Sequence, residues 1–176
     1  MEKIYFGTGC FWCSEEIFKN LRGVNSVVSG YAGGSVKNPT YDQVSTGNTG
    51  HAEVVEVLYN SSVVKLEDLL EVFFTIHDPT SLNKQGADVG TQYRSIILYT
   101  NANQKILAEK VKTEFQKCFD KPIVTEIVPL QNFYKAEEYH QNFYKNNPNY
   151  GYCQVVINPK LEKFRKKYKD LVKQSK

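Results

Sequence analysis

The sequence has no long hydrophobic run: among its 176 residues, nowhere do about 18 apolar residues follow one another without interruption. A helix that crosses a bilayer is therefore not expected. The amino-terminal residues MEKIYFGTGCFW also lack the basic leader, apolar stretch and small-residue cleavage site of a signal peptide. These two absences predict a cytoplasmic protein with no membrane partner.

Cysteine is scarce as well, since the chain contains only Cys10, Cys13, Cys118 and Cys153. A domain of this length buries about two thirds of its unfolded surface without cross-links, and a reducing compartment would keep structural bridges open. Any disulfide is therefore expected to be a catalytic intermediate. Cys118 lies on the apolar side of a helical pattern and is predicted to belong to the core.

The ligands that would turn the C-x-x-C of Cys10 and Cys13 into a zinc site are also missing. Such a site needs a second closely spaced pair of ligands. The sequence contains no second C-x-x-C and no H-x-x-x-H. We therefore expect neither a metal nor another cofactor.

Charge of one sign is not in large excess, because the formal net charge is only +3. Much of the excess lies in the last stretch, KLEKFRKKYKDLVKQSK, where apolar residues recur at helical spacing. The pattern predicts a docked helix at about 160–174 with a solvated basic face, so no nucleic-acid partner is expected. The apolar residues of this pattern are Leu161, Phe164, Tyr168, Leu171 and Val172.

Strand-like runs rich in valine, isoleucine and tyrosine alternate with helical patterns along the chain. No repeat, long linker or low-complexity tract interrupts them. They predict one α/β (α+β) domain over residues 1–176, with a sheet backed by helices. Long polar loops at 32–51, 78–92 and 135–152 are expected to be functional and to meet near the end of the first strand.

Cys10 is predicted to lie at a strand-to-helix turn, because the strand pattern KIYFGTG precedes it and the helical pattern FWCSEEIFKNL follows it. Free backbone N–H groups and the positive end of the helix dipole stabilise a thiolate at such a turn. We therefore expect a lowered pKa and a nucleophilic thiol. The alternative is that Cys10 is a small buried side chain without a chemical role.

Phe11 and Trp12 separate the two cysteines of the C-x-x-C. A dithiol between a strand and a helix is typical of a general thiol-disulfide oxidoreductase that uses Cys10 and Cys13. Two large aromatic side chains instead form a wall suited to a small apolar group, such as a methyl carried on sulfur. Ordinary core packing is the third interpretation of these two rings.

Four further residues could move or hold protons. Glu53 lies at the entrance of the apolar strand pattern AEVVEVLY, where partial desolvation would raise its pKa and prepare it to donate a proton. Asp88 and Tyr93 precede another strand pattern, and Tyr41 lies in a loop. Tyrosine hydroxyls can hold an oxygen that gains negative charge, and packing is the alternative for each of them.

The chain resembles the peptide methionine sulfoxide reductases of the A type. The resemblance covers about residues 3–160 and rests on long motifs in a fixed order. These motifs are GCFW at 9–12, VSGYAGG at 28–34, NPTYDQV at 38–44, GHAEVV at 50–55, GADVGTQYRS at 86–95 and EEYHQNFY at 137–144.

The resemblance implies a two-layer sandwich around a mixed sheet. It also implies an oxidoreductase that reduces the S epimer of methionine sulfoxide, free or in proteins, with thioredoxin, or dithiothreitol in vitro, as the reductant. Phe11 and Trp12 would then hold the ε-methyl of the substrate. A small enzyme that must admit protein side chains is expected to be a monomer.

The resemblance also implies a role for each polar residue. Cys10 would attack the sulfoxide sulfur and become a sulfenic acid, while Glu53 protonates the sulfoxide oxygen. Tyr41 and Tyr93 would hydrogen-bond that oxygen, and Asp88 would order the polar side of the site.

The cysteine that resolves the sulfenic acid stays open at this stage. Many relatives have glycine at the position of Cys13 and a glycine-rich tail with recycling cysteines, which is missing here. Cys153 matches the first of those tail positions, although the following QVVI could form a strand that holds it in place. Cys13 is three residues from Cys10 and could bridge to it. An outside thiol could also reduce the sulfenic acid directly.

His140 and Tyr144 in EEYHQNFY are four positions apart, which predicts that they share one face of a short helix. Packing is one interpretation. The other is that they order the site, or the recycling loop, from behind.

Overall fold

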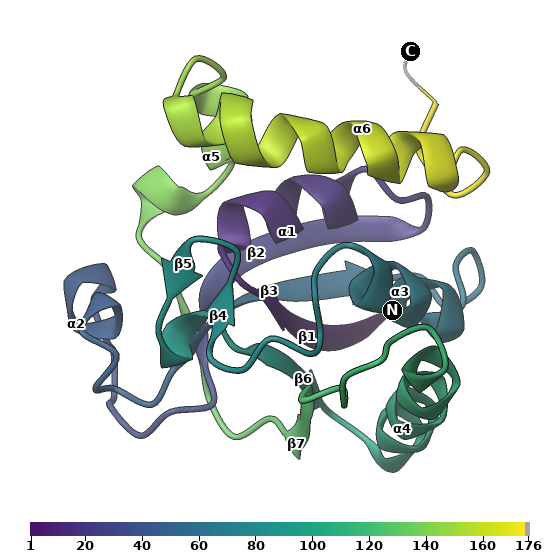
Figure 1. Ribbon diagram of the computed structural model, residues 1–176, viewed down its shortest axis with the longest axis horizontal. Helices are drawn as coiled ribbons and strands as arrows, with labels where there is room; N and C mark the ends of the chain where they lie inside the picture. The colour runs from purple at the N-terminus through teal and green to yellow at the C-terminus, as the bar shows by residue number, and fades with distance from the viewer. Residues whose placement is uncertain (175–176) are drawn as a thin grey trace.

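A six-stranded mixed sheet forms the centre of the protein in a computed structural model, which describes residues 1–174 (Figure 1). Neighbouring strands are antiparallel except for β6 and β7, which are parallel. A separate hairpin pairs β4 (Lys84–Gln85) with β5 (Asp88–Val89). The sheet strands, in their spatial order, are β7 (Glu126–Pro129), β6 (Ser95–Tyr99), β1 (Glu2–Thr8), β3 (Ala52–Tyr59), β2 (Val24–Ala32) and β8 (Phe133–Lys135).

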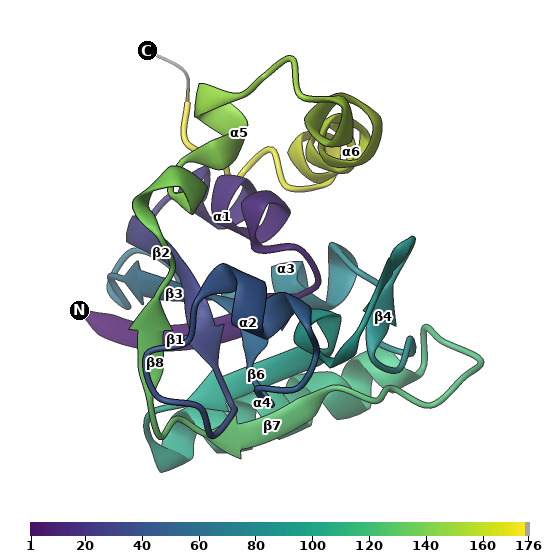
Figure 2. The same ribbon diagram turned by 90° about the vertical axis from the view of Figure 1, so that its left-hand side faces the viewer.

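Helices cover one face of this curled sheet, so the predicted mixed sheet backed by helices is confirmed. α1 and α6 lie one above the other on that side (Figures 1 and 2). The main helices are α1 (Phe11–Lys19), α3 (Leu66–Thr75), α4 (Ala102–Gln116) and α6 (Asn158–Lys167). Shorter elements are α2 (Tyr41–Ser45), α5 (Phe143–Asn146), the 3₁₀ helices η1 (Thr91–Tyr93) and η2 (Glu138–His140), and a π-helix at Cys153–Ile157.

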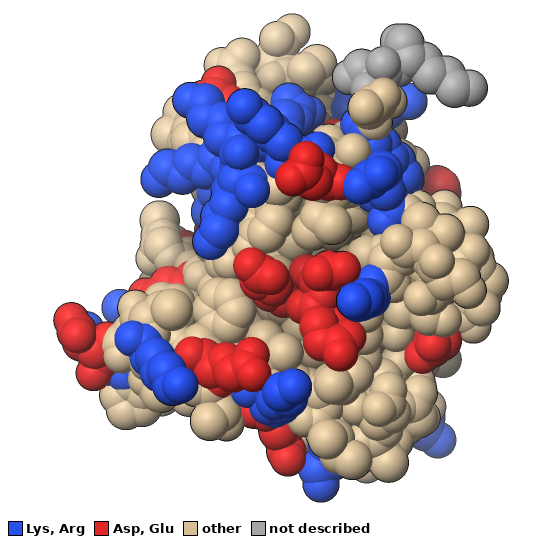
Figure 3. All heavy atoms as spheres, turned by 90° about the vertical axis from the view of Figure 1, so that its right-hand side faces the viewer, with Lys and Arg blue, Asp and Glu red and all other residues tan. Residues whose placement is uncertain are grey.

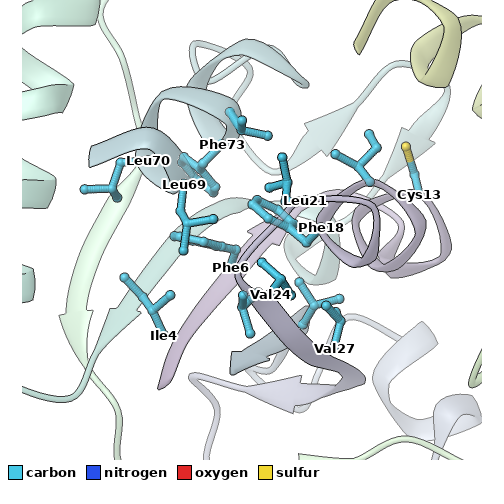
Figure 4. Packing of buried hydrophobic residues seen from close by; sticks show 14 of the residues in the cluster. Ile4, Phe6, Cys13, Phe18, Leu21, Val24, Val27, Leu69, Leu70 and Phe73 are labelled. Atoms are coloured by element: carbon cyan, nitrogen blue, oxygen red, sulfur yellow. The ribbon is translucent and has the colours of Figure 1, made fainter. Parts of the chain in front are cut away.

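The core follows from the alternation of side chains along the strands. Ile4 and Phe6 of β1 point to the helices, and Tyr5 points to the opposite face. Figure 4 shows Ile4 and Phe6 packed with side chains from α1 and α3. Each fully buried side chain of this kind contributes about 1.5–3 kcal/mol by leaving water. The same alternation directs residues 53, 55 and 57 of β3 toward the helices.

The carboxyl-terminal helix is shorter than predicted, because α6 ends at Lys167. Leu161, Phe164 and Tyr168 are buried as expected. Tyr168 leaves the helical conformation, and the backbone oxygen of Leu171 then accepts a hydrogen bond from Arg22 at 2.8 Å. Val172 forms a β-bridge with Leu21. The last apolar residues therefore pack as a turn against the end of α1, while basic side chains gather around α6 (Figure 3).

The prediction for Cys118 is wrong, and the alternative of a strand after Cys153 is excluded. QVVI does not form a strand, because Cys153–Ile157 is a π-helix that buries Cys153 and Ile157 and continues into α6. Cys118 is exposed, since α4 ends at Gln116 and the chain turns there, with the N–H of Cys118 bonded to the oxygen of Phe115 at 2.9 Å. Within the described residues, no helix is long and apolar enough to cross a membrane.

Candidate active site

Cys10 lies at the turn between β1 and α1, as the sequence predicts. β1 ends at Thr8, and Cys10 is the N-cap of α1. The chain enters this turn through Gly9, whose φ of +106° favours glycine. A Cβ atom at Gly9 would also lie 2.8 Å from the Cβ of Gln85. The turn holds Cys10 partly exposed at the end of a buried strand.

Glu53 reaches the same turn from β3. Its side chain is 2% exposed, and its Oε1 accepts a hydrogen bond from the backbone N–H of Phe11 at 3.2 Å. Burial raises the pKa of Glu53 to about 8, although the bond from Phe11 opposes the rise. The predicted desolvated acid is therefore present, and it is largely protonated at neutral pH.

A cavity of about 110 Å³ lies against Cys10 and Glu53, and we call it the carboxyl cavity. It brings together six of the predicted residues, which come from four distant stretches of the chain. Its lining residues are Cys10, Trp12, Tyr41, Glu53, Asp88, Tyr93, Tyr150 and Tyr152. The three long loops thus meet at the end of the first strand, as expected.

Tyr41 and Tyr93 bring hydroxyl groups to the carboxyl cavity. Tyr41 begins α2, where a capping box at Thr40 starts the helix, and its backbone N–H donates to Oε2 of Glu137 at 3.0 Å. Burial, and next the Glu53 carboxyl, raises the pKa of both tyrosines. Both side chains therefore remain neutral O–H donors.

Trp12 and Phe11 occupy different places. Trp12 lines the carboxyl cavity and stacks on Phe143, with ring centroids 3.7 Å apart. Phe11 is 1% exposed and packs behind the cavity against Tyr31 and His140. Trp12 therefore forms an apolar wall of the cavity, and Phe11 packs behind it.

His140 and Tyr144 do not share a helix face, so that prediction is wrong. The backbone N–H of Asn142, between them, donates to both carboxylate oxygens of buried Glu15 at 3.0 Å, and Asn142 adopts a left-handed conformation. This contact interrupts the helical conformation, so η2 and α5 are separate elements. The buried His140 accepts a hydrogen bond from the indole N–H of Trp12 at 3.0 Å, whereas Tyr144 donates to Asn158.

Tyr150 and Tyr152 belong to the site although sequence reasoning did not single them out. The Tyr152 hydroxyl donates to Oδ2 of Asp88 at 2.6 Å, and both tyrosine rings pack edge-on against Trp12. The sequence signal that could have identified these two tyrosines is their position next to Cys153 in NYGYCQ. That signal does not say that this segment folds over Cys10, because the contact joins residues 64 positions apart.

The pKa of Cys10 is raised, whereas the sequence predicts that it is lowered. Burial, followed by the negative charge that Glu53 carries when ionised, outweighs the N–H of Trp12, which lowers the pKa. At neutral pH the resting site therefore holds a thiol beside a carboxylic acid. Such a pair can supply a nucleophilic sulfur and a proton to one polar, oxygen-bearing group.

Comparison with known proteins agrees with this arrangement. The family model for peptide methionine sulfoxide reductase matches residues 2–172. The chain belongs to the peptide methionine sulfoxide reductase family. It is 52% identical to the peptide methionine sulfoxide reductase MsrA of Sulfolobus acidocaldarius over 170 residues, which is 97% of each chain.

Two solved structures of one yeast protein are also similar. The reduced form of Mxr1 from Saccharomyces cerevisiae has a TM-score of 0.82 and 38% identity, and the match covers 86% of this chain and 88% of that one. Mxr1 in complex with Trx2 has a TM-score of 0.59 and 30% identity, covering 81% and 84%. The chain is therefore an oxidoreductase that reduces methionine sulfoxide.

For a methionine sulfoxide reductase, the places of the other cysteines matter, because thiols supply the electrons. A second cavity, of about 190 Å³, shares Cys10, Asp88 and Tyr152 with the carboxyl cavity, and we call it the two-cysteine cavity. Cys13 lines it, whereas Cys153 is fully buried in the π-helix and lines neither cavity. The complete lining is Cys10, Cys13, Gln85, Gly86, Ala87, Asp88, Tyr152, Val156 and Lys160.

Proposed function

We propose that Cys10 attacks the sulfur of methionine S-sulfoxide while Glu53 donates its proton to the sulfoxide oxygen. The observation that carries the proposal is the buried Glu53, with a pKa of about 8, beside the Cys10 thiol. A sulfoxide oxygen leaves sulfur only when it is protonated, so a neutral acid is what the step requires. Near neutral pH, Glu53 meets that requirement without an external proton source.

The other residues of the carboxyl cavity would hold the substrate in place. Tyr41 and Tyr93 donate hydrogen bonds to the same oxygen, and Trp12 contacts the ε-methyl group with Phe11 behind it. Asp88 orders the polar side by fixing the hydroxyl of Tyr152. A substrate with one small apolar group and one oxygen on sulfur suits these contacts.

The reaction transfers one oxygen atom from the substrate sulfur to Cys10. Methionine sulfoxide and the Cys10 thiol give methionine and a Cys10 sulfenic acid. The attack forms a transient sulfur–sulfur bond between Cys10 and the substrate. This bond and the S–O bond of the substrate break as an S–O bond forms on Cys10 and methionine leaves. Glu53 gives its proton to that oxygen and regains one from the Cys10 thiol, so that protons balance.

We propose Cys13 as the thiol that condenses with the sulfenic acid to give a disulfide and water. Cys10 is the N-cap of α1 and Cys13 its third residue, a spacing that allows the Cα separation of about 4.4–6.8 Å that disulfides need. Cys153 would first have to leave the π-helix. Thioredoxin then reduces the disulfide by exchange, which the similarity to the Mxr1 complex with Trx2 supports.

This dependence on a reducing protein supports a cytoplasmic location, where free thiols persist. In that compartment the enzyme would act as a monomer on free and protein-bound methionine sulfoxide. Cell fractionation followed by light scattering of the purified protein tests both points. Recovery in an oxidising compartment, or as a stable dimer, would contradict them.

A single-turnover assay without reductant tests the proposed function. Wild-type enzyme is expected to form methionine from the S epimer and not from the R epimer, and Cys10→Ser is expected to form none. Cys118→Ser is the matched control, because that thiol is exposed and far from the site in sequence. Methionine formation by Cys10→Ser would refute the assignment. Reduction of insulin disulfides at a rate unaffected by Glu53→Gln would instead support a general thiol-disulfide oxidoreductase.

A further inference from the structure

The two-cysteine cavity contains a positive charge that the reaction at Glu53 does not use. Lys160 lies in the first turn of α6 and lines this cavity together with Cys10 and Cys13. Its side chain is partly buried. Within residues 1–174, no salt bridge holds its ammonium group; the four ion pairs there involve other residues. The charge of Lys160 is therefore available to a group inside the cavity.

Cys13 is an ionisable group of the same cavity on which this charge acts. Cys13 is 5% exposed at the edge of the core on α1 (Figure 4). Burial raises the pKa of Cys13 to about 11, Lys160 lowers it and Glu16 raises it. Asp88 also lines the cavity, and nearby His77 is neutral because burial lowers its pKa to about 4. Lys160 is thus the positive charge that favours the Cys13 thiolate.

We infer that Lys160 promotes the ionisation of Cys13, and that the two-cysteine cavity is where the Cys13 thiolate attacks the Cys10 sulfenic acid. This inference rests on the proposed function, which supplies the sulfenic acid. The sulfur–sulfur bond forms, the S–O bond of the sulfenic acid breaks, and the departing hydroxide takes up the proton that Cys13 lost. Lys160 is a positioning residue, because it acts through Cys13.

The same charge serves the next step. When a thiolate of thioredoxin attacks Cys10 in the disulfide, Cys13 leaves as a thiolate, and a leaving thiol of lower pKa departs faster. Lys160 stabilises that leaving group as it stabilises the attacking one. A cation beside Cys13 therefore assists both the formation and the reduction of the disulfide.

The size of the effect follows from thiol chemistry. Raising the pKa of Cys13 by one unit at neutral pH lowers the thiolate fraction about tenfold. The more basic thiolate is a better nucleophile, so the rate of attack falls by only about threefold per unit. Removing Lys160 should therefore slow disulfide formation by roughly threefold for each unit by which the pKa of Cys13 rises, without preventing it.

The experiment is a single-turnover reaction with methionine sulfoxide between pH 7 and 10 in a Cys118→Ser background, which removes the exposed thiol. Methionine and free thiols are measured over time. We expect Lys160→Met to form methionine at the normal rate and to lose its second thiol more slowly. Lys160→Arg should restore the rate, and Glu16→Gln should increase it. Between pH 7 and 10 both rates of second-thiol loss should rise with pH while their ratio stays nearly constant, because this range lies below the pKa of Cys13.

The outcomes separate this inference from the proposed function. In Cys13→Ser, or in Cys13→Ala if the serine variant is unstable, one thiol should be lost per methionine, and a sulfenic-acid trapping reagent should label Cys10. Two thiols lost in both variants would overturn the inference and leave the role of Cys10 intact. Equal slowing in Lys160→Met and Lys160→Arg, or none, would also overturn it. Absence of methionine from the wild type would refute the proposed function and this inference with it.

Discussion

The two cavities beside Cys10 share three residues and differ in what they present to its sulfur. The carboxyl cavity presents Glu53, a neutral acid at physiological pH. The two-cysteine cavity presents a second thiol and the ammonium of Lys160. Reduction of the sulfoxide needs a proton for an oxygen, whereas disulfide formation needs a thiol that has lost one. An acid that must keep its proton and a thiol that must lose its proton need opposite electrostatic surroundings. A single cavity could therefore not serve both steps.

The fold keeps the two environments apart by building them from different elements. β3 carries Glu53 to one part of the Cys10 turn, and α6 carries Lys160 to another. A lysine close to Glu53 would lower the pKa of that carboxyl and remove the acid. Asp88 and Tyr152 line both cavities, and their hydrogen bond lies where the two meet.

The largest effect is expected when the acid of the carboxyl cavity is removed. Glu53→Gln keeps the shape of the side chain and loses the transferable proton, so methionine formation should fall by about 10²–10⁴-fold. Single-turnover rates measure this loss. Glu56→Gln is the matched control on the same strand, because Glu56 pairs with Lys3 at 3.1 Å outside both cavities. A decrease of less than a few-fold in Glu53→Gln would contradict the role of Glu53.

The tyrosine donors should come next in size. Tyr41→Phe and Tyr93→Phe each remove one O–H, and each is expected to lower kcat/KM for methionine sulfoxide about tenfold, and more in the double variant. Tyr99→Phe, at the end of β6 and outside the carboxyl cavity, should have little effect. Unchanged kcat/KM in the double variant would show that neither hydroxyl contacts the sulfoxide oxygen.

The two steps should respond to pH in opposite directions. Glu53 must be protonated to act, so methionine formation should decline above about pH 8, approaching tenfold per pH unit. The rate constant for loss of the second thiol, measured after the sulfenic acid has formed, should increase over the same range, because that step needs the Cys13 thiolate. Rapid-quench measurements of methionine and thiols in one reaction series give both slopes. Parallel slopes would mean that the two cavities do not act separately.

The last prediction concerns stability and not a rate. The pKa of Glu53 is about 8 in the folded protein and close to the ordinary carboxyl value of 4.5 when unfolded. Between these values the folded state binds more protons, so the free energy of unfolding should fall as pH rises from about 4.5 to 8. Urea denaturation should therefore find Glu53→Gln more stable than wild type at pH 8, by a few kcal/mol, and less so at pH 5. No change in this difference with pH would mean that Glu53 ionises normally.

Local patterns were enough to predict much of the site. The strand before Cys10, the helix after it and the entrance position of Glu53 all depend on the periodicity of neighbouring residues, which short-range sterics and burial determine. The raised pKa of Glu53 followed from its strand, because a carboxyl at the end of an apolar alternation is carried toward the core. Cys10 behaved differently, since its pKa depends on Glu53 and on burial supplied by distant segments.

The predictions that failed concern segments whose structure is set by distant partners. His140 and Tyr144 would share a helix if Glu15, 127 positions before Asn142, did not bind the backbone between them. Leu171 and Val172 would continue α6 if residues 21 and 22 did not offer backbone partners.

The sequence by itself predicted Cys10 and Glu53 as candidate nucleophile and acid, and the sheet that carries them, because these depend on residue type and local period. The roles of Tyr41 and Tyr93 came from the resemblance to the family. Only the tertiary structure decided that Tyr150 and Tyr152 fold over Cys10, that Cys153 is enclosed in a π-helix, and that Lys160 lies beside Cys13. The physical reason is that each of these depends on the packing of the carboxyl-terminal segment against α1. That packing joins residues far apart in the chain, so the spacing of residues within either segment does not predict it.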